Sequence, residues 1–191
     1  MDFDLVIIGS GPGGYVAAIR GAQLGLNVAI IEKEALGGIC LNWGCIPTKS
    51  FLRSAEVLKI IKSSEKYGIK SELGHVDISE IVKRSRSIAK KLSNGVQYLL
   101  KKNKVRIFYG EASFKSSKCI KIKSRNNTVQ EISSEHICIA SGGRPREISG
   151  ISNPNSVWFY KEALQVEKIP NKLLVVGSGA IGVEFASFFA Q

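Results

Sequence analysis

The sequence predicts an α/β fold in which a parallel sheet with crossover helices is followed by a small antiparallel β-meander. Three observations predict it. Residues 3–32 read as an apolar run, a glycine-rich turn, a helical stretch and a second apolar run, which is the pattern of a βαβ unit. Four short strand patterns fall between 105 and 140, and another apolar run with a glycine-rich turn starts near 171. Hydrophobic residues make up 44% of the 191 residues, which suits a globular protein and argues against disorder.

The beginning of the chain is expected to hold a strand, a helix, a second strand and a loop. The apolar runs at 3–9 and 27–32 predict buried strands. Helical periodicity covers 13–25 and ends near Gly25. The stretch 33–44 is expected to be a loop.

The middle of the chain is expected to hold two helices and then four strands. Pro47 is tolerated in a first helical turn, so one helix is expected from about Cys45 to Ser63. The second spans roughly 78–102 and has an apolar stripe, with Lys and Arg elsewhere. Strands are expected near 105–109, 112–115, 118–124 and 128–140, with a hairpin tip at Asn126-Asn127 and an end at Gly142-Gly143-Arg144-Pro145.

The end of the chain reads as the start of another βαβ unit. From Asn171 the sequence gives a strand pattern LLVV, a turn GSGAIG and a helix pattern VEFASFFAQ. Because a lone strand and helix cannot bury their own apolar faces, we expect this chain to be a fragment of a longer protein. The expected organisation is a first domain at 1–150, a linker at 151–170 and the start of a truncated second domain at 171–191.

The formal net charge of +11 comes mostly from one region, between residues 83 and 125. Such a basic face could attract nucleic acid or an acidic protein, but no nucleic-acid motif accompanies it. We favour the interpretation that these basic residues cover the solvated surface of a helix and a hairpin. The basic residues are Lys83, Arg84, Arg86, Lys90, Lys91, Lys101, Lys102, Lys104, Arg106, Lys115, Lys118, Lys121, Lys123 and Arg125.

The sequence favours a cytoplasmic protein without a membrane partner. No apolar run approaches the roughly 18 to 20 residues that a membrane span needs. Asp2 and Asp4 oppose the basic start of a signal peptide. A mature protein of an organellar matrix is the alternative, because removal of a transit peptide would leave no trace.

Two of the four cysteines lie in strand patterns. Cys119 and Cys138 sit in alternating or apolar runs and are expected to be core or strand residues. A zinc site would need shorter ligand spacings and histidine partners, and His75 and His136 do not supply that pattern, so no metal is expected.

The first glycine-rich turn has the features of a dinucleotide site. Gly9 permits a tight turn, Gly11 has no side chain to block a pyrophosphate, and Gly14 lets the helix pack close to the strand. The helix N-terminus offers backbone N–H groups to phosphates. Glu32 closes the second strand, where a carboxylate can accept hydrogen bonds from ribose hydroxyls. The alternative is a strand–helix turn with no ligand.

The second turn, Gly177-Ser178-Gly179-Ala180-Ile181-Gly182, repeats this pattern after LLVV. The acidic residue that would end its second strand lies beyond Gln191, so the sequence does not distinguish NAD from NADP. Two dinucleotide sites in one chain favour FAD together with a nicotinamide nucleotide. The expected fold is therefore a Rossmann-like FAD-binding domain followed by the first strand and helix of a Rossmann-like NAD domain.

The remaining cysteines, Cys40 and Cys45, form a pair separated by four residues. In a regular helix their Cα atoms would lie about 8.6 Å apart, farther than a disulfide usually allows. They can be bridged only if the backbone departs from a helix, which Gly44 permits. Cys45 would then lie at a helix start, where the helix dipole stabilises a thiolate, and Lys49 adds positive charge one turn on. Two unlinked thiols are the alternative.

The segment GGICLNWGCIPTKS, together with GSGPGGYVAA before it, resembles the pyridine nucleotide-disulfide oxidoreductases. The ending CIPTKS is more typical of the lipoamide enzymes of that family than of its glutathione and mercuric reductases. The resemblance covers the whole chain. It implies a flavoprotein that oxidises dihydrolipoamide, carried on an acyltransferase or lipoyl-carrier protein, with reduction of NAD, and that is a homodimer at full length.

The resemblance also implies roles for individual residues. Cys40 would be the thiol that meets dihydrolipoamide, and Cys45 the thiolate that faces the flavin. Lys49 would lie near the flavin and pair with Glu184, for which a solvated helical Glu is the alternative. FAD would be held by Gly9, Gly11, Gly14, Glu32, Lys33, Gly38, Cys40, Lys49, Ala112, Ser141, Gly142 and Gly143. NAD would be held by Gly177, Gly179, Ile181, Gly182 and Glu184.

The chain departs from the family pattern in two ways. Ile39 stands where Thr is usual and Trp43 where Val is usual, both between or beside the paired cysteines. The last strand of the FAD domain and the C-terminal His–Glu acid/base pair of the family are absent from these residues, so the fragment is expected to be inactive by itself. Two rival functions remain open: another disulfide reductase of the family, and a non-catalytic basic binding module.

Overall fold

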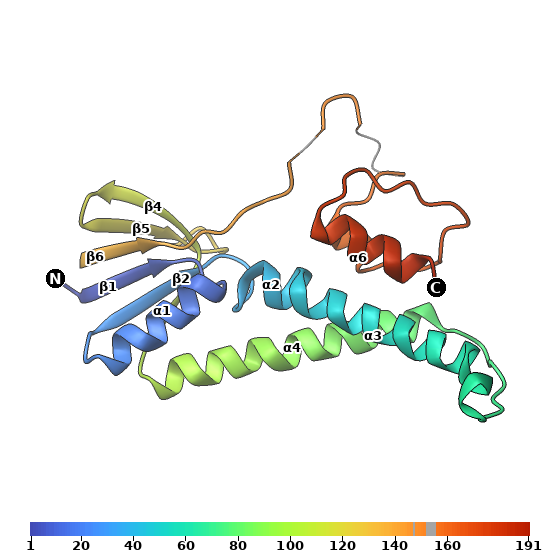
Figure 1. Ribbon diagram of the computed structural model, residues 1–191. Coiled ribbons are helices and arrows are strands. Elements are labelled where there is room, and N and C mark those ends of the chain that lie inside the picture. The colour runs from blue at the N-terminus through green and yellow to red at the C-terminus, as the bar shows by residue number, and fades with distance from the viewer. Residues whose placement is uncertain (147, 152–155) are drawn as a thin grey trace. The chain divides into compact units, whose positions relative to one another are not determined.

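The structure is a computed structural model, and it describes residues 1–146, 148–151 and 156–191. Residue 147 of the expected first domain and residues 152–155 of the expected linker lie outside the described residues. The elements in chain order are β1 (Phe3–Ile8), α1 (Pro12–Gln23), β2 (Val28–Glu32), α2 (Gly38–Trp43), α3 (Cys45–Lys62), the 3-10 helix η1 (Ser64–Tyr67), α4 (Ile78–Lys102), β3 (Arg106–Tyr109), β4 (Glu111–Ser116), β5 (Cys119–Lys123), β6 (Val129–Ile139), α5 (Tyr160–Ala163) and α6 (Ala180–Phe189) (Figure 1).

The chain divides into two compact units. The sheet unit comprises Met1–Asn42 and Lys90–Arg144, and the helical unit comprises the described residues of Trp43–Ala89 and Pro145–Gln191. Each unit is built from two stretches of chain that are far apart in the sequence. The domain boundaries expected from the sequence are placed by the two glycine-rich turns, whereas these units are defined by compactness. The expected boundaries therefore stay a prediction.

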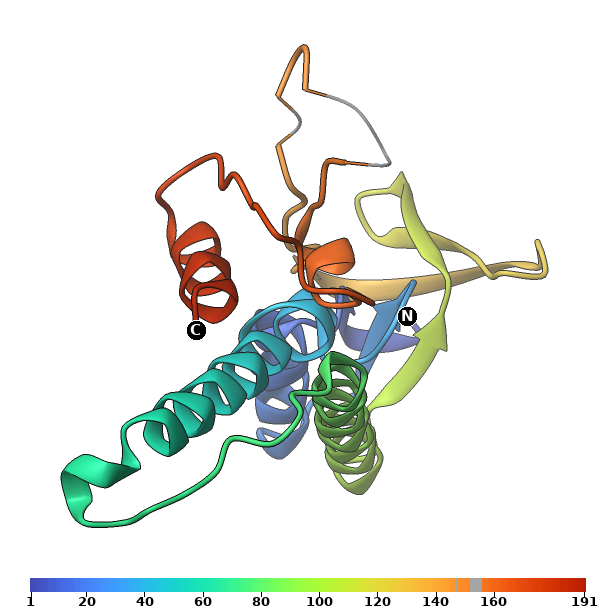
Figure 2. The same cartoon turned by 90° about the vertical axis from the view of Figure 1, so that its right-hand side faces the viewer.

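The sheet unit contains a six-stranded sheet in the order β3-β2-β1-β6-β5-β4. Strands β3, β2, β1 and β6 run parallel, whereas β6, β5 and β4 form an antiparallel meander. Figure 2 shows the meander from a second side. The helix α1 provides the crossover between β1 and β2, and all five residues of β2 are buried. This architecture confirms the α/β, Rossmann-like fold that the sequence predicts.

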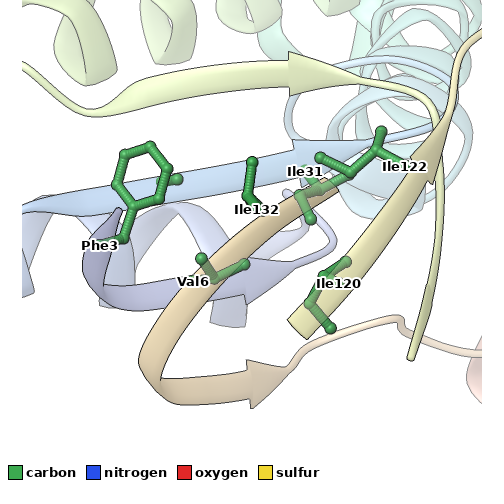
Figure 3. Close-up of a cluster of buried hydrophobic side chains, with 7 residues drawn as sticks. Phe3, Val6, Ile31, Ile120, Ile122 and Ile132 are labelled. Atoms are coloured by element: carbon green, nitrogen blue, oxygen red, sulfur yellow. The ribbon is translucent and has the colours of Figure 1, made fainter. Parts of the chain in front are cut away.

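The core of the sheet unit joins the meander to the parallel strands. Isoleucines alternate with exposed lysines along β5, so that one face of this strand is apolar. Its Ile120 and Ile122 cluster with Val6 of β1, Ile31 of β2 and Ile132 of β6 (Figure 3). The burial of this cluster holds the antiparallel strands against the parallel ones.

The helical unit has an aromatic core. Phe51 of α3 is fully buried and its ring centroid lies 4.7 Å from that of Phe188 of α6. Phe185 of α6, with Ala163 and Leu164 at the end of α5, completes this cluster. The apolar stripe of α6 therefore packs on α3, and it positions the residues that begin α6.

The expected loop at 33–44 is partly wrong, because Gly38–Trp43 form the helix α2. Six residues are too few to show a helical repeat in the sequence. Gly37 and Gly38 have positive φ angles of 94° and 62° and turn the chain into the helix. The Asn42 side-chain Nδ2 donates to the carbonyls of Leu36 and Gly38, at 2.9 Å each, and thus stabilises this turn.

The strand expected at LLVV is also wrong, since residues 173–176 form no strand. Leu174 is 88% exposed. A strand needs hydrogen bonds to a neighbouring strand, and no pairing to this stretch exists among the residues that the structure describes. The helix expected after it does form, as α6.

In the part of the chain that the structure describes, none of the helices has both the length and the apolar character to span a membrane.

The turn between β1 and α1 brings backbone atoms unusually close together. Gly9 has a φ of +100°, and a Cβ atom on Gly14 would lie 1.9 Å from the Gly9 carbonyl oxygen. No side chain fits at this second position, so α1 can pack against the end of β1 only with glycine there. Gly13 differs, because a Cβ atom there would meet no atom within 4 Å.

We therefore expect opposite effects from two neighbouring substitutions. Gly14→Ala should lower the free energy of unfolding by about 2–3 kcal/mol or more, because α1 must move away from the turn. Gly13→Ala is the matched control and should leave stability unchanged or raise it by at most about 1 kcal/mol, since Ala favours the helix. Urea unfolding followed by circular dichroism measures both. Equal stability of the two variants would contradict the packing described.

Candidate functional site

The residues expected to bind the first nucleotide gather at one edge of the sheet. Gly9 follows β1, Glu32 ends β2 and Ser141 lies just beyond β6, and these three parallel strands are neighbours. The backbone bonds that close the edge are Gly9 N–H to the Ile31 carbonyl and Ala140 N–H to the Ile8 carbonyl, each 2.8 Å. Ligands of open α/β sheets bind at the carboxyl ends of their strands.

The remaining candidates in the sheet unit lie on segments that start from the same edge. Gly142 and Gly143 continue the chain after β6, and Lys33 continues it after β2. Ala112 of β4 follows a turn in which the Gly110 N–H donates to the Glu32 carbonyl at 2.9 Å. Lys49 belongs to the helical unit and is described with it below.

The start of α1 has the properties of a phosphate site. Gly11 has an extended backbone, with φ −63° and ψ −179°, and no side chain caps the helix. The first helical bond runs from Tyr15 N–H to the Gly11 carbonyl, so the preceding N–H groups have no helical acceptor. A Cβ atom on Gly11 would meet nothing within 4 Å, which leaves open space over the turn. A pyrophosphate fits a helix end of this kind.

Glu32 has a buried carboxylate that accepts three hydrogen bonds. The residue is 8% exposed. Its Oε2 accepts from the Ser10 N–H at 3.0 Å and from the Ser10 hydroxyl at 2.5 Å, and its Oε1 accepts from the Glu34 N–H at 2.8 Å. Among the described residues Glu32 has no ion-pair partner. A buried carboxylate held in this way is suited to receive a further donor from a ligand.

The start of α2 packs directly on the glycine turn. The Gly37 N–H donates to the Ser10 carbonyl at 3.0 Å. A Cβ atom on Gly38 would lie 2.6 Å from the Gly11 Cα, so only glycine fits at this contact. Because α2 also carries Cys40, this cysteine belongs to the helix that packs on the glycine turn.

Cys40 and Cys45 form a disulfide. Cys40 lies within α2 and Cys45 is the first residue of α3. Between the helices Gly44 has φ −140° and ψ −111°, far from helical values, so the backbone departs from a helix where the sequence predicts it must. Two unlinked thiols, the alternative considered above, are excluded.

Cys45 lies at the exposed start of a long helix. Cys45 is exposed, and its position at the start of an 18-residue helix places it at the positive end of the helix dipole. The Thr48 hydroxyl donates to the Gly44 carbonyl at 2.7 Å and fixes the first turn. Cys119 and Cys138 are free thiols in β5 and β6, as expected for strand residues.

The ion pair expected between Lys49 and Glu184 is present. The Lys49 Nζ lies 2.5 Å from the Glu184 Oε1. The two side chains come from α3 and α6 of the helical unit and are 60% and 26% exposed. A pair this open to solvent contributes little to stability. Its interest lies in its position, because Lys49 is one helical turn after Cys45.

The second glycine turn has nearly the same geometry as the first. Gly177 has a φ of +105°, and Gly179 precedes α6 with an extended backbone at φ −70° and ψ 167°. A Cβ atom on Gly182 would lie 2.7 Å from the Gly177 carbonyl oxygen, which repeats the close contact of the first turn. Ile181 is 62% exposed and Glu184 lies one turn into α6. The second turn thus repeats the backbone geometry of the first.

Two features of the site escaped the sequence analysis. The Trp43 ring lies beneath the Arg86 guanidinium, with 4.2 Å between the ring centroid and Cζ, and the Lys161 Nζ lies 5.5 Å from the same centroid. Burial lowers the pKa of Arg86 from its ordinary value.

The second feature is the role of Ser10. Its position between the motif glycines accepts many small residues, so the sequence gives no signal for it. Ile39, which departs from the family pattern, is 40% exposed in α2.

Across the described residues no three His, Cys, Asp or Glu side chains come together as a metal site would require.

Comparison with known proteins agrees with this geometry. The profile of the family "Pyridine nucleotide-disulphide oxidoreductase" matches residues 3–191. The chain is 48% identical to a dihydrolipoyl dehydrogenase of Zymomonas mobilis over 99% of its length, and 48% identical to one of Rhizobium etli over 98%. It is 44% identical to a dihydrolipoyl dehydrogenase of Bacillus subtilis over 98% of its length.

The matches cover 41%, 42% and 41% of these three relatives, so the chain spans about two fifths of their length. The match of the family profile nevertheless extends over almost every residue of this chain. The chain belongs to the pyridine nucleotide-disulphide oxidoreductase family.

Proposed function

We propose that this chain is part of a dihydrolipoyl dehydrogenase, an enzyme that oxidises dihydrolipoamide to lipoamide and reduces NAD. The observation that carries the proposal is the disulfide between Cys40 and Cys45, whose second cysteine begins a helix. Relatives of that name match the chain over nearly its whole length, which supports the assignment.

The proposed cofactors are FAD at the first glycine turn and NAD at the second. The open helix start at Gly11 suits a pyrophosphate, and the buried carboxylate of Glu32 suits a ribose. The other groups proposed to hold FAD are Gly9, Gly14, Lys33, Gly38, Cys40, Lys49, Ala112, Ser141, Gly142 and Gly143. The groups proposed to hold NAD are Gly177, Gly179, Ile181, Gly182 and Glu184.

The chain's own thiols perform the first half of the proposed reaction. A thiolate of dihydrolipoamide attacks Sγ of Cys40, the Cys40–Cys45 bond breaks, and Cys45 leaves as a thiolate. The second thiolate of the substrate then displaces Cys40, which yields the cyclic disulfide of lipoamide and two reduced cysteines. Two electrons pass from substrate to protein, and the dipole of α3 together with Lys49 stabilises the Cys45 thiolate. Bound FAD and NAD supply the electron acceptors that return the cysteines to the disulfide.

The proposal extends to the assembly in which this chain would act. The carrier of dihydrolipoamide would be an acyltransferase or lipoyl-carrier protein, and the enzyme would be a homodimer in the cytoplasm or an organellar matrix. The resemblance implies a His–Glu pair outside these 191 residues for proton transfer. We therefore expect the 191 residues alone not to turn over.

Replacement of the thiolate cysteine tests the proposal. In the protein at its natural length, Cys45→Ser should lower dihydrolipoamide-dependent NAD reduction by about a thousandfold or more, because the disulfide can no longer form. Cys138→Ser removes a thiol in β6 and should retain nearly full activity. Steady-state assays with dihydrolipoamide and NAD measure both. Full activity of Cys45→Ser would refute the mechanism.

The ion pair allows a second test. Glu184→Gln removes the charge that faces Lys49, and we expect kcat/KM for NAD to fall by about tenfold while the thermal unfolding midpoint stays close to the original. Glu56→Gln is the matched control, since it breaks an exposed ion pair with Arg53 on the same helix α3. If the two variants have the same activity, Glu184 has no role in the reaction.

A further inference from the structure

Ser10 is fully buried and makes two contacts with one carboxylate oxygen. Its N–H and its hydroxyl both donate to Oε2 of Glu32, at 3.0 and 2.5 Å. The Gly37 N–H donates to the same hydroxyl oxygen at 3.3 Å. Because the hydroxyl has one proton and gives it to Glu32, it accepts the Gly37 N–H through a lone pair.

The number of acceptor positions on Glu32 is limited. A carboxylate offers about four lone-pair positions, two on each oxygen. Ser10 occupies both positions on Oε2, and the Glu34 N–H, at 2.8 Å, occupies one on Oε1. Among the described residues no donor occupies the fourth position, which lies on Oε1.

We propose that Ser10 is a positioning residue, which holds the Glu32 carboxylate so that Oε1 presents one acceptor position to a ribose hydroxyl of an adenine nucleotide. The inference rests on the proposed binding of FAD at the first glycine turn. It deepens that proposal, because it assigns ribose recognition to a pair of residues rather than to Glu32 alone.

Ser10 is needed because the buried carboxylate of Glu32 must be held in one orientation. Glu32 is 8% exposed and has no cationic partner among the described residues, so hydrogen bonds alone hold it in place. Hydrogen bonds to a charged acceptor are stronger than neutral ones, and the loss of one typically changes an affinity by about tenfold to a hundredfold. Without the Ser10 hydroxyl the carboxylate can rotate, and Oε1 is no longer held toward the ligand.

Deoxyribose analogues of FAD separate this role from simple packing. The protein at its natural length is stripped of flavin, and the dissociation constants of FAD and of its 2′-deoxyadenosine and 3′-deoxyadenosine analogues are measured by flavin fluorescence. The ribose ratio is the dissociation constant of the weaker-binding analogue divided by that of FAD. We expect a ribose ratio of about ten or more in the original protein, and of less than about three in Ser10→Ala.

The matched control is Ser134→Ala. Ser134 is also fully buried, and its hydroxyl donates to the His136 carbonyl at 2.7 Å. It pairs with Phe3 at the opposite end of β1, so its loss should leave the ribose ratio unchanged. If Ser10→Ala does not fold, as judged by circular dichroism, Ser10→Gly replaces it, because it also removes the hydroxyl donor, and it should lower the ribose ratio in the same way.

The possible failures are distinguishable. A role of Ser10 in packing alone would weaken FAD and both analogues equally, so an unchanged ribose ratio in Ser10→Ala would overturn the inference and leave the proposed function intact. A ribose ratio near one in the original protein would also overturn it. No binding of FAD to the original protein would instead overturn the proposed function.

Discussion

The contact between α1 and the end of β1 is the constraint on which the candidate site depends. A helix that follows a strand after three residues must place its first turn almost against the strand, and here the gap leaves no room for a Cβ atom at Gly14. That approach aims the unbonded N–H groups of the helix start beyond the sheet edge. It also brings Ser10 within reach of Glu32, and the start of α2 within reach of Gly11.

The repeated turn shows that this geometry is local. Gly9 and Gly177 adopt φ angles of 100° and 105°, and each helix that follows begins after an extended glycine. The first turn has a paired strand before it, whereas residues 173–176 have none in the described part of the chain. The glycines and the helix are therefore sufficient to form the turn. A strand before the turn forms only where a neighbouring strand supplies its backbone hydrogen bonds.

Local patterns explain which parts of the structure were predictable. Strands β1 and β2 and helices α3 and α4 have strong apolar runs or stripes, and they form where the sequence predicts them. The helix α2 was missed because its six residues hold no repeat, and its stability comes from the Asn42 side chain and two turned glycines. The cysteine bridge was foreseeable as a possibility because Gly44 can break a helix. The roles of Ser10 and of Arg86 over Trp43 depend on contacts between distant segments, which no spacing rule reveals.

The central claim is that dihydrolipoamide reduces the Cys40–Cys45 bridge, and peptide mapping tests it most directly. The protein at its natural length is titrated anaerobically with dihydrolipoamide, alkylated with iodoacetamide and digested with trypsin, which cleaves after Lys33 and Lys49 and releases both cysteines in one peptide. We predict that one equivalent of dihydrolipoamide converts this peptide from unlabelled to doubly labelled. A peptide that stays unlabelled under excess dihydrolipoamide, while dithiothreitol labels it at both cysteines, would contradict the account.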